Sequence, residues 1–484
     1  METPDTLVAP DAAAASRGGA SLLVLQTFGR VLGLVFVMVL TRQLDPANVG
    51  RYSTAAAVVL FANVMADFGT SPAITRLVSR DPRESKKVLS GTLVASFLFG
   101  TVVAAAIVIF GVTVYDGPVS VDIAVASLAI PAASVLSSLL GALDGVGLIA
   151  RRAVVTAIQT VVVAFGAIPV LAGADVRAAV LALAVAPWIA LAVAACMTRA
   201  AGLCDPDLRL DPAEIGRLLR MALPFALSGG LSALILRFDV IFLSVVATPA
   251  ETATYDLALR LLEATTYAST AIGGPLLFIL SRRLGRGDRE GAARAYGEAM
   301  RLLYAIGLPL SVGLATLAHP LVTTALGPGF GAVATPLIIM GAAQWLTFVI
   351  MVQGTLVMSG DVVGRGVAVG GLIAAVTIGL DLVLVPLYGA NGAAAAMVAS
   401  WVFAAGLLDV FHRRTVGIAT PLPSPGLLTA SAAMGLVVFV LSGSPLVVAV
   451  IAGAFTYGAV VFLTGAVTSG DVARLRRAMS CQSA

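Results

Sequence analysis

The chain has 484 residues, of which 59% are hydrophobic and 12% are charged, and its mean hydropathy is +1.00. Soluble domains are roughly half apolar and a quarter charged, so water is not the main solvent of this chain. The net charge of +4 does not indicate nucleic-acid binding, because the basic residues fall in short connections between apolar runs. Three cysteines, Cys196, Cys204 and Cys481, form no CxxC pair and have no histidine nearby, so they indicate neither a disulfide framework nor a zinc site.

Apolar segments of about twenty residues recur along the chain and predict membrane-spanning helices. They lack the alternation of barrel strands, so the expected fold is an all-α integral membrane protein of about fourteen transmembrane helices. The first segment has no cleavage site after it and is interpreted as a retained helix. The predicted segments are 21–41, 53–75, 88–112, 120–141, 153–172, 178–197, 221–247, 254–280, 299–319, 332–357, 367–387, 392–411, 424–442 and 445–467.

The charges between these segments predict the orientation of the chain. Arginine and lysine gather in alternate connections, for example at Arg151 and Arg152 and again at Arg413 and Arg414. Basic side chains are retained on the cytoplasmic side, so a multi-pass protein of the inner (cell) membrane with both termini in the cytoplasm is predicted. The opposite connections hold few basic residues, and their charged residues include Arg42, Arg51, Asp116, Asp122, Asp175, Arg177 and Glu251.

The sequence also repeats itself. PANVGRY at 46–52 aligns with PAETATY at 249–255, an offset of 203 that also carries Pro72 to Pro275 and Arg80 to Arg283. Further on, GAD at 173–175 echoes GAN at 389–391. A parallel repeat of two pseudo-symmetric six-helix lobes is predicted, a symmetry suited to alternating access. The expected divisions are a cytoplasmic tail 1–20, an N-lobe 21–198, a cytoplasmic linker 199–220, a C-lobe 221–411, a further helix pair 412–468 and a basic cytoplasmic tail 469–484.

No catalytic or cofactor motif is visible. The chain has no GxxxxGK[ST] sequence, and its two histidines, His319 and His412, do not form HExxH or a supported triad. The carboxylates that an enzyme would need are scattered. We therefore expect no enzyme, no metal site and no cofactor.

Ionisable residues inside the apolar segments are the candidates for function. Each costs about 2.5–3.5 kcal/mol at the centre of a lipid-facing helix, so most should face a partner or a water-filled cavity. They concentrate in the first, second, seventh and eighth segments, which are repeat-equivalent pairs and would line the same central space. The candidate substrate-binding residues are Arg30, Asp67, Arg237, Asp239, Arg260 and Glu263.

A structural interpretation competes with this one. Asp256, Arg260 and Glu263 recur at i, i+4 and i+7 on one helical face, so they can simply neutralise one another. Arg30 has no acidic neighbour on its own face, which favours a cavity role. Arg237 and Asp239 lie on different faces and need partners elsewhere. Arg76 and Asp409 lie near helix ends, where headgroups are within reach.

Several stretches together resemble a known family. They are TRQLDPANVGRYS, ADFGTSPAITRLVSRDPRESKK, GALDGVGLIARRA, LLRMALPFALSGG and FDVIFLSVV. In order and spacing they are similar to the polysaccharide-flippase branch of the multidrug/oligosaccharidyl-lipid/polysaccharide exporter superfamily. The resemblance covers nearly the whole chain and implies two six-helix lobes around a V-shaped cavity. It also implies outward movement of a polyprenyl-diphosphate-linked oligosaccharide for surface polysaccharide assembly.

In such a cavity, Arg30 with Arg237 or Arg260 would hold the diphosphate, because a guanidinium matches phosphate oxygens. The acids here match the arginines in number, which leaves room for coupling to H⁺ or Na⁺ through Asp67, Asp239 or Glu263. The implied partners are the lipid-linked oligosaccharide, membrane lipids and polysaccharide polymerase machinery, and a duplicated chain is simplest as a monomer.

Three other readings stay open. A multidrug or cation antiporter of the same superfamily is ranked second, because Arg30 and Arg260 would repel cations. A peptidoglycan-precursor flippase shares the architecture but typically has a denser arginine cluster in its first two helices. A membrane-embedded glycosyltransferase or polymerase is ranked last, because such enzymes usually have a large extracytoplasmic loop or domain and every predicted outside connection here is short.

Overall fold

The computed structural model describes residues 12–80, 82–203, 237–359 and 363–465, together with 216, 220–223, 229 and 230. Every regular element in this described part is a helix. The chain divides into two compact units between Ile241 and Phe242, and each is described by itself. The predicted linker 199–220 and tail 469–484 lie largely outside the described residues. The predicted lobe limits remain predictions.

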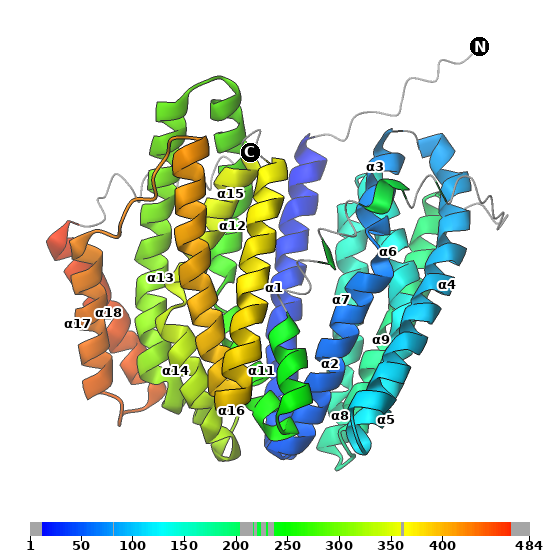
Figure 1. The fold of residues 1–484 in the computed structure, drawn as a ribbon, viewed down its shortest axis with the longest axis horizontal. Coiled ribbons are helices and arrows are strands. Elements are labelled where there is room, and N and C mark those ends of the chain that lie inside the picture. Colours follow the sequence, from blue (N-terminus) through cyan, green and yellow to red (C-terminus); the bar gives the residue numbers. More distant parts are fainter. Residues whose placement is uncertain are drawn as a thin grey trace. The chain divides into compact units, whose positions relative to one another are not determined.

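The first unit is built around α6. This helix packs against α2, α3, α4 and α9, while α7 lies against α1 and α9. Leu136, Leu139 and Leu143 of α6 are buried in the core that these helices share. The helices are α1 (Ala12–Gln43), α2 (Pro46–Asp67), α3 (Thr70–Arg80), α4 (Pro82–Val114), α5 (Pro118–Ser127), α6 (Ala129–Gly145), α7 (Ile149–Phe165), α8 (Ala167–Leu171) and α9 (Arg177–Ala200) (Figure 1).

The second unit is organised around α13, which packs against α12, α14, α15, α17 and α18. Its core includes Tyr296, Met300 and Phe348, all fully buried. After the helical residues 242–246, the elements are α11 (Pro249–Glu263), α12 (Tyr267–Gly285), α13 (Arg289–Ala325), the 3₁₀ helix η1 (Pro328–Val333), α14 (Ala334–Ala342), α15 (Trp345–Ser359), α16 (Val363–Thr415), α17 (Pro425–Val440) and α18 (Leu446–Thr464).

The repeat predicted from the sequence begins the same way in both units. Pro46 opens α2 and Pro249 opens α11, in each case at the first helical position, where the missing N–H costs no hydrogen bond. Thr248 precedes the second of these prolines, and its side chain accepts a hydrogen bond from the backbone N–H of Glu251. The offset of 203 therefore aligns two helix starts.

Helix breaks divide several of the predicted segments. The segment 53–75 is interrupted at Phe68 and Gly69, whose φ angles are 46° and 68°. Segments 120–141, 153–172 and 254–280 are also split into two helices, and the stretch Pro328–Ala342, which is η1 with α14, is bent by 45° relative to α15. By contrast, α16 runs through two predicted segments and changes direction at Gly389, where its two halves meet (Figure 1).

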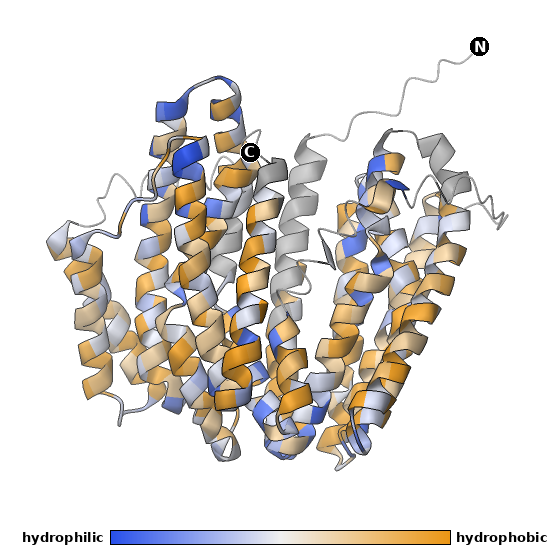
Figure 2. Cartoon of the chain, viewed as in Figure 1, coloured by the Kyte–Doolittle hydropathy of each residue, from blue (hydrophilic) through white to orange (hydrophobic). Residues whose placement is uncertain are grey.

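The surface of the helices is that of a membrane protein. Leu98, Val102 and Ile109 lie on one face of α4 and are each more than half exposed, as are Phe455 and Phe462 of α18. Figure 2 shows apolar residues along the middle of the helices and hydrophilic residues nearer their ends. An exposed apolar face of this kind is typical of contact with lipid.

By length and composition, eight of the described helices can cross a membrane, or nine if α14 and α15 with η1 form one bent span. The predicted all-α membrane fold is confirmed. Each predicted segment falls at least partly on a described helix, but many of these helices are broken or incompletely described, so the count of fourteen remains a prediction.

Candidate functional site

The predicted site residues fall in both units. Asp67, Arg237 and Asp239 belong to the first, and Arg260 and Glu263 belong to the second. Arg30 lies in α1, but its side chain is outside the described part of the structure. The charged residues are therefore described unit by unit.

Asp67 is the last residue of α2 and stands at the break before α3. Its Oδ1 accepts hydrogen bonds from Ser137 Oγ at 2.7 Å, from Thr70 Oγ1 at 3.2 Å and from the backbone N–H of Ser71 at 3.3 Å. Ser71 is in the first turn of α3, where N–H groups have no intrahelical acceptor. Asp67 thus caps α3 and ties the break to α6, whether or not it also binds an ion.

A chain of hydroxyl groups continues inward from this break. Thr70 Oγ1 lies 3.3 Å from Ser138 Oγ, which in turn lies 3.0 Å from Ser96 Oγ of α4. Ser134 Oγ donates to the carbonyl oxygen of Ala66 at 2.9 Å, one of the acceptors freed where α2 ends. The break is therefore supplied with polar partners from α4 and α6, all within the first unit.

Close helix packing makes this contact possible. A Cβ atom on Gly141 would lie 3.0 Å from the backbone Cα of Ser71, and one on Gly145 would lie 2.6 Å from Cβ of Val78. The Gly141-x3-Gly145 spacing is thus a packing surface for α3.

Arg237 and Asp239 begin the described part of the next helix, residues 237–246. Asp239 is buried, with 4% of its surface exposed, and its Oδ1 accepts the backbone N–H of Val240 at 2.7 Å. Arg237 is half-buried. A buried carboxylate in a membrane helix needs polar partners, so this region stays a candidate for function.

The second unit carries its charges on α11. Arg260 Nε donates to Asp256 Oδ2 at 2.7 Å, and Asp256 is 1% exposed while the Arg260 side chain is 30% exposed. Glu263, also half-buried, is the last residue of α11. The predicted structural pairing of Asp256 with Arg260 is confirmed. The Arg260 side chain thus remains partly exposed while it is paired.

The break after α11 has its own polar contacts, which the sequence analysis missed. Gln344, fully buried between α14 and α15, donates from Nε2 to Thr265 Oγ1 at 3.0 Å. Ser311 Oγ of α13 accepts the backbone N–H of Trp345 at 2.8 Å. Two helix breaks of the second unit thus face each other across one hydrogen bond. The sequence did contain a sign of this contact, because a glutamine, Gln344, lies inside the apolar segment 332–357.

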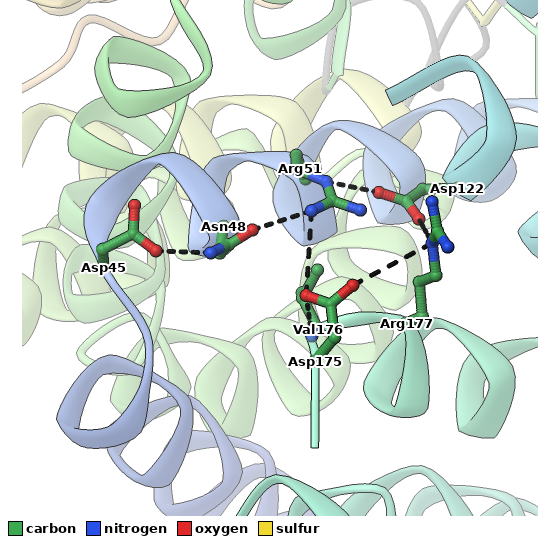
Figure 3. A network of polar contacts seen from close by, with 7 residues as sticks. All are labelled: Asp45, Asn48, Arg51, Asp122, Asp175, Val176 and Arg177. Atoms are coloured by element: carbon green, nitrogen blue, oxygen red, sulfur yellow. Dashed lines mark hydrogen bonds and ion pairs between the residues drawn. The ribbon is translucent and has the colours of Figure 1, made fainter. Parts of the chain in front are cut away.

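A second missed cluster joins three elements of the first unit (Figure 3). Asp122 of α5 is fully buried, and its Oδ2 accepts a hydrogen bond of 2.7 Å from Arg51 Nε of α2. Its Oδ1 lies 3.6 Å from Arg177 Nε at the start of α9, and Asp175 is an ion-pair partner of both arginines. The sequence did contain a sign of this cluster, because residues of opposite charge lie in successive connections on one predicted side of the membrane.

These groups can bind charged or polar ligands, and they offer little for covalent chemistry. Among the described residues, no group of three or more His, Cys, Asp or Glu side chains lies close enough to hold a metal ion. Charged residues stand at the ends of α2 and α11, next to helix breaks. Such interrupted helices are the usual place for substrate and ion sites in transporters.

Comparison with known families gives one match. The family model described as "Polysaccharide biosynthesis protein" matches residues 15–278, more than half of the chain. A comparison with curated protein sequences found no match. The match to this family model confirms the family resemblance that was found in the sequence.

Solved structures share the fold. Lipid II flippase MurJ in an inward closed conformation is similar with a TM-score of 0.77 and 12% identity, covering 92% of this chain and 98% of that chain. An inward-facing MATE family multidrug resistance transporter of the MOP superfamily has a TM-score of 0.65 and 16% identity, with 80% and 94% covered. An outward-facing MATE transporter has a TM-score of 0.58 and 15% identity, with 83% and 96% covered.

Proposed function

This chain belongs to the family of polysaccharide biosynthesis proteins, and from that premise we propose that it carries a polyprenyl-diphosphate-linked oligosaccharide from the cytoplasmic to the outer leaflet by alternating access. The observation that carries the proposal is the combination of this family with a fold found in a lipid II flippase. A family concerned with polysaccharide synthesis needs its lipid-linked intermediates moved across the bilayer. The fold supplies the architecture for such a movement.

Arginine is the residue that would recognise the diphosphate. A guanidinium presents several N–H donors in a planar fork and stays charged at all physiological pH values. Arg260 is partly exposed, and the bond from its Nε to Asp256 fixes the orientation of its side chain. We assign the diphosphate contacts to Arg30, Arg237 and Arg260, and we assign coupling to H⁺ or Na⁺, if the transport cycle uses it, to Asp67, Asp239 or Glu263.

The membrane setting follows from the charge pattern. The proposal places the chain in the inner membrane with both termini in the cytoplasm, because basic residues gather in alternate connections. The substrate is then loaded from the side on which nucleotide-activated sugars are used, and it is released unchanged on the other side. No covalent step is part of the proposal.

A second candidate is a flippase for a peptidoglycan precursor. The TM-score of 0.77 to lipid II flippase MurJ favours this candidate over a cation antiporter, for which the highest TM-score among the structures described above is 0.65. Both flippase substrates share a polyprenyl diphosphate and differ in the sugar. A transport assay with two sugars separates them.

The test uses the full chain purified into proteoliposomes that contain a polyprenyl-diphosphate oligosaccharide or lipid II. Movement is measured as access of an added glycosidase or lectin to the labelled sugar. We expect wild-type protein to move the oligosaccharide and Arg260→Ala to lose at least about 90% of the rate. Arg294→Ala is the matched control, because Arg294 is exposed and pairs only with exposed Glu290 among the described residues.

Three results would change the assignment. Movement of lipid II but not of the polyprenyl-diphosphate oligosaccharide would identify the protein as a flippase for a peptidoglycan precursor. If neither lipid-linked substrate moves and an organic cation such as ethidium is taken up, the protein is a cation antiporter. Full activity of Arg260→Ala would remove that residue from the substrate path.

A further inference from the structure

A polar pocket of about 720 Å³ opens at one end of the second unit. It is formed where the start of α11, the η1–α14 segment and the kink of α16 come together, three elements that contact one another. Its polar side chains include Glu251 and Thr254 from α11, Thr335 from α14, and Tyr388 and Asn391 from either side of the kink. Every lining residue belongs to the second unit.

The pocket is separate from the charged residues discussed above. Glu251 and Arg260 lie on the same helix, nine residues apart, which corresponds to about 13.5 Å along the axis at 1.5 Å per residue. Glu251 is in the first turn of α11, whereas Arg260 is in the last turn, next to the break. A ligand in the pocket would therefore contact the opposite end of α11.

Glu251 gives the pocket a negative charge. Its carboxylate has no hydrogen-bond or ion-pair partner among the described residues, and none of the described lining residues is basic. A Cβ atom on Gly389 would collide with Glu251 Oε2, so the carboxylate lies directly against the kinked backbone. Gly389 has φ 56° and ψ −132°, a conformation that glycine adopts without strain. The kink thus makes room for the carboxylate.

The pocket can be compared with the corresponding region of the first unit, residue by residue. The offset of 203 carries Arg51 to Thr254 and Asn48 to Glu251, and the GAD and GAN motifs carry Asp175 to Asn391. Both motifs include a glycine with positive φ, 89° at Gly173 and 56° at Gly389.

In the first unit the guanidinium of Arg51 fills this region and pairs with Asp122 and Asp175 (Figure 3). In the second unit a threonine stands at the position of that arginine, and Glu251 stands at the position of Asn48, whose Oδ1 accepts a hydrogen bond of 2.8 Å from Arg51 in the first unit. The pocket is the space that the guanidinium fills in the first unit, and its carboxylate replaces a neutral asparagine there.

The size and the polar groups define what would fit. The volume lies within the range of about 300–1,000 Å³ that small-molecule sites have and far exceeds the ~30 Å³ of a single water, so an isolated ion would not fill it. Thr254 Oγ1 donates to the carbonyl oxygen of Ala250 and keeps its lone pairs for a ligand donor. Asn391 adds two N–H donors and an acceptor, and Tyr388, 65% exposed, presents an aromatic face.

We infer that this pocket binds a small polyhydroxylated ligand that carries one ammonium group, the chemistry of an amino sugar. Glu251 accepts a charge-assisted hydrogen bond from the ammonium group in place of the guanidinium that the first unit supplies itself. Thr254, Thr335 and Asn391 bind the hydroxyl groups. The inference goes beyond the proposed transport and does not depend on it, because binding is measured without any movement across a membrane.

The experiment compares glucosamine with glucose on the full chain in lipid nanodiscs, by saturation-transfer NMR and calorimetric titration. We expect glucosamine to bind and glucose to bind at least about tenfold more weakly, since a hydrogen bond to a charged group is worth about 1.5–3 kcal/mol. Glu251→Gln should weaken glucosamine binding by a similar factor and leave glucose binding unchanged. Thr254→Arg should abolish binding of both, because it restores the guanidinium of the first unit to this position.

Glu290→Gln is the control, since Glu290 is an exposed acid of the same unit that pairs with Arg294. Equal binding of the two sugars would overturn the inference, as would unchanged glucosamine binding in Glu251→Gln. If Glu251→Gln lowers thermal stability while glucosamine binding persists, Glu251 only compensates the dipole of the second half of α16, and the inference is wrong. A failure of transport in the assay described above would leave these binding results untouched.

Discussion

Arg260 and Asp256 lie one turn apart on α11, and the Arg260 Nε donates a hydrogen bond of 2.7 Å to Asp256 Oδ2. Asp256 is 1% exposed, so its charge depends on partners within the protein. Removing one member of a buried pair costs more than removing both, because the remaining charge keeps its desolvation penalty. Variants of this pair can therefore show whether Arg260 has a structural role or a role in transport.

Arg260→Ala is expected to destabilise the protein by about 3 kcal/mol, because it leaves the Asp256 carboxylate buried without this arginine. Asp256→Asn combined with Arg260→Ala should recover part of that loss. Thermal unfolding in detergent measures both. If the double variant regains stability but not transport, Arg260 acts on the substrate; if it regains both, the arginine is only a structural partner.

Variants of Asp67 can likewise distinguish a helix-capping role from a role in ion coupling in the first unit. Asp67→Ala removes the acceptor that caps α3 and should cost about 1–2 kcal/mol of stability. Asp67→Asn keeps an oxygen at this position and should cost much less. A stable Asp67→Asn protein with normal transport would restrict this residue to capping. Loss of transport at unchanged stability would instead support ion coupling through the carboxylate.

Asp122→Asn is expected to lower stability by about 3 kcal/mol, because Asp122 is fully buried and accepts from Arg51 while lying 3.6 Å from Arg177. Asp116→Asn is the control, since Asp116 is exposed in the connection just before α5. Chemical or thermal unfolding compares the two. Equal stability of both variants would show that the ion pairs around Asp122 contribute nothing net.

The kink of α16 predicts a difference between two glycines of one helix. Gly389→Ala should destabilise by at least about 1–2 kcal/mol, because its φ of 56° is unfavourable for alanine and the new Cβ would meet the Glu251 carboxylate. Gly379→Ala meets no neighbouring atom and should be neutral or stabilising by about 1 kcal/mol. Thermal unfolding of the two variants in the same detergent is the measurement. Equal effects would contradict the conformation described for Gly389.

The helices were predictable because apolar length is a local property of the sequence. The break after α2 was not, since the sequence predicted one continuous segment over 53–75 while the chain bends at Phe68 and Gly69. Pro72 lies in the first turn of α3, where proline is tolerated, and Pro275 lies inside α12. The two units also break at different positions of the repeat, which an offset of 203 between helix starts could not show.

The candidate site was predictable only in part. An i, i+4 pair such as Asp256 and Arg260 can be found from spacing, because both residues share one helix. Asp67 with Ser137 and Arg51 with Asp122 are each separated by about seventy residues, and their contact depends on how helices pack. Asp409 pairs with Arg413 at i, i+4, which spacing allows, and it also accepts the backbone N–H of Thr420, which spacing could not show.

The breaks after α2 and after α11 each have polar partners inside their own unit, Asp67 with Ser137 in the first and Thr265 with Gln344 in the second. Neither half leaves these groups exposed in hydrocarbon until the other half is made. The polar groups at the break of the first unit therefore need no partner from the second unit for these hydrogen bonds. A duplicated unit whose helix break has such partners of its own does not depend on its copy for these hydrogen bonds.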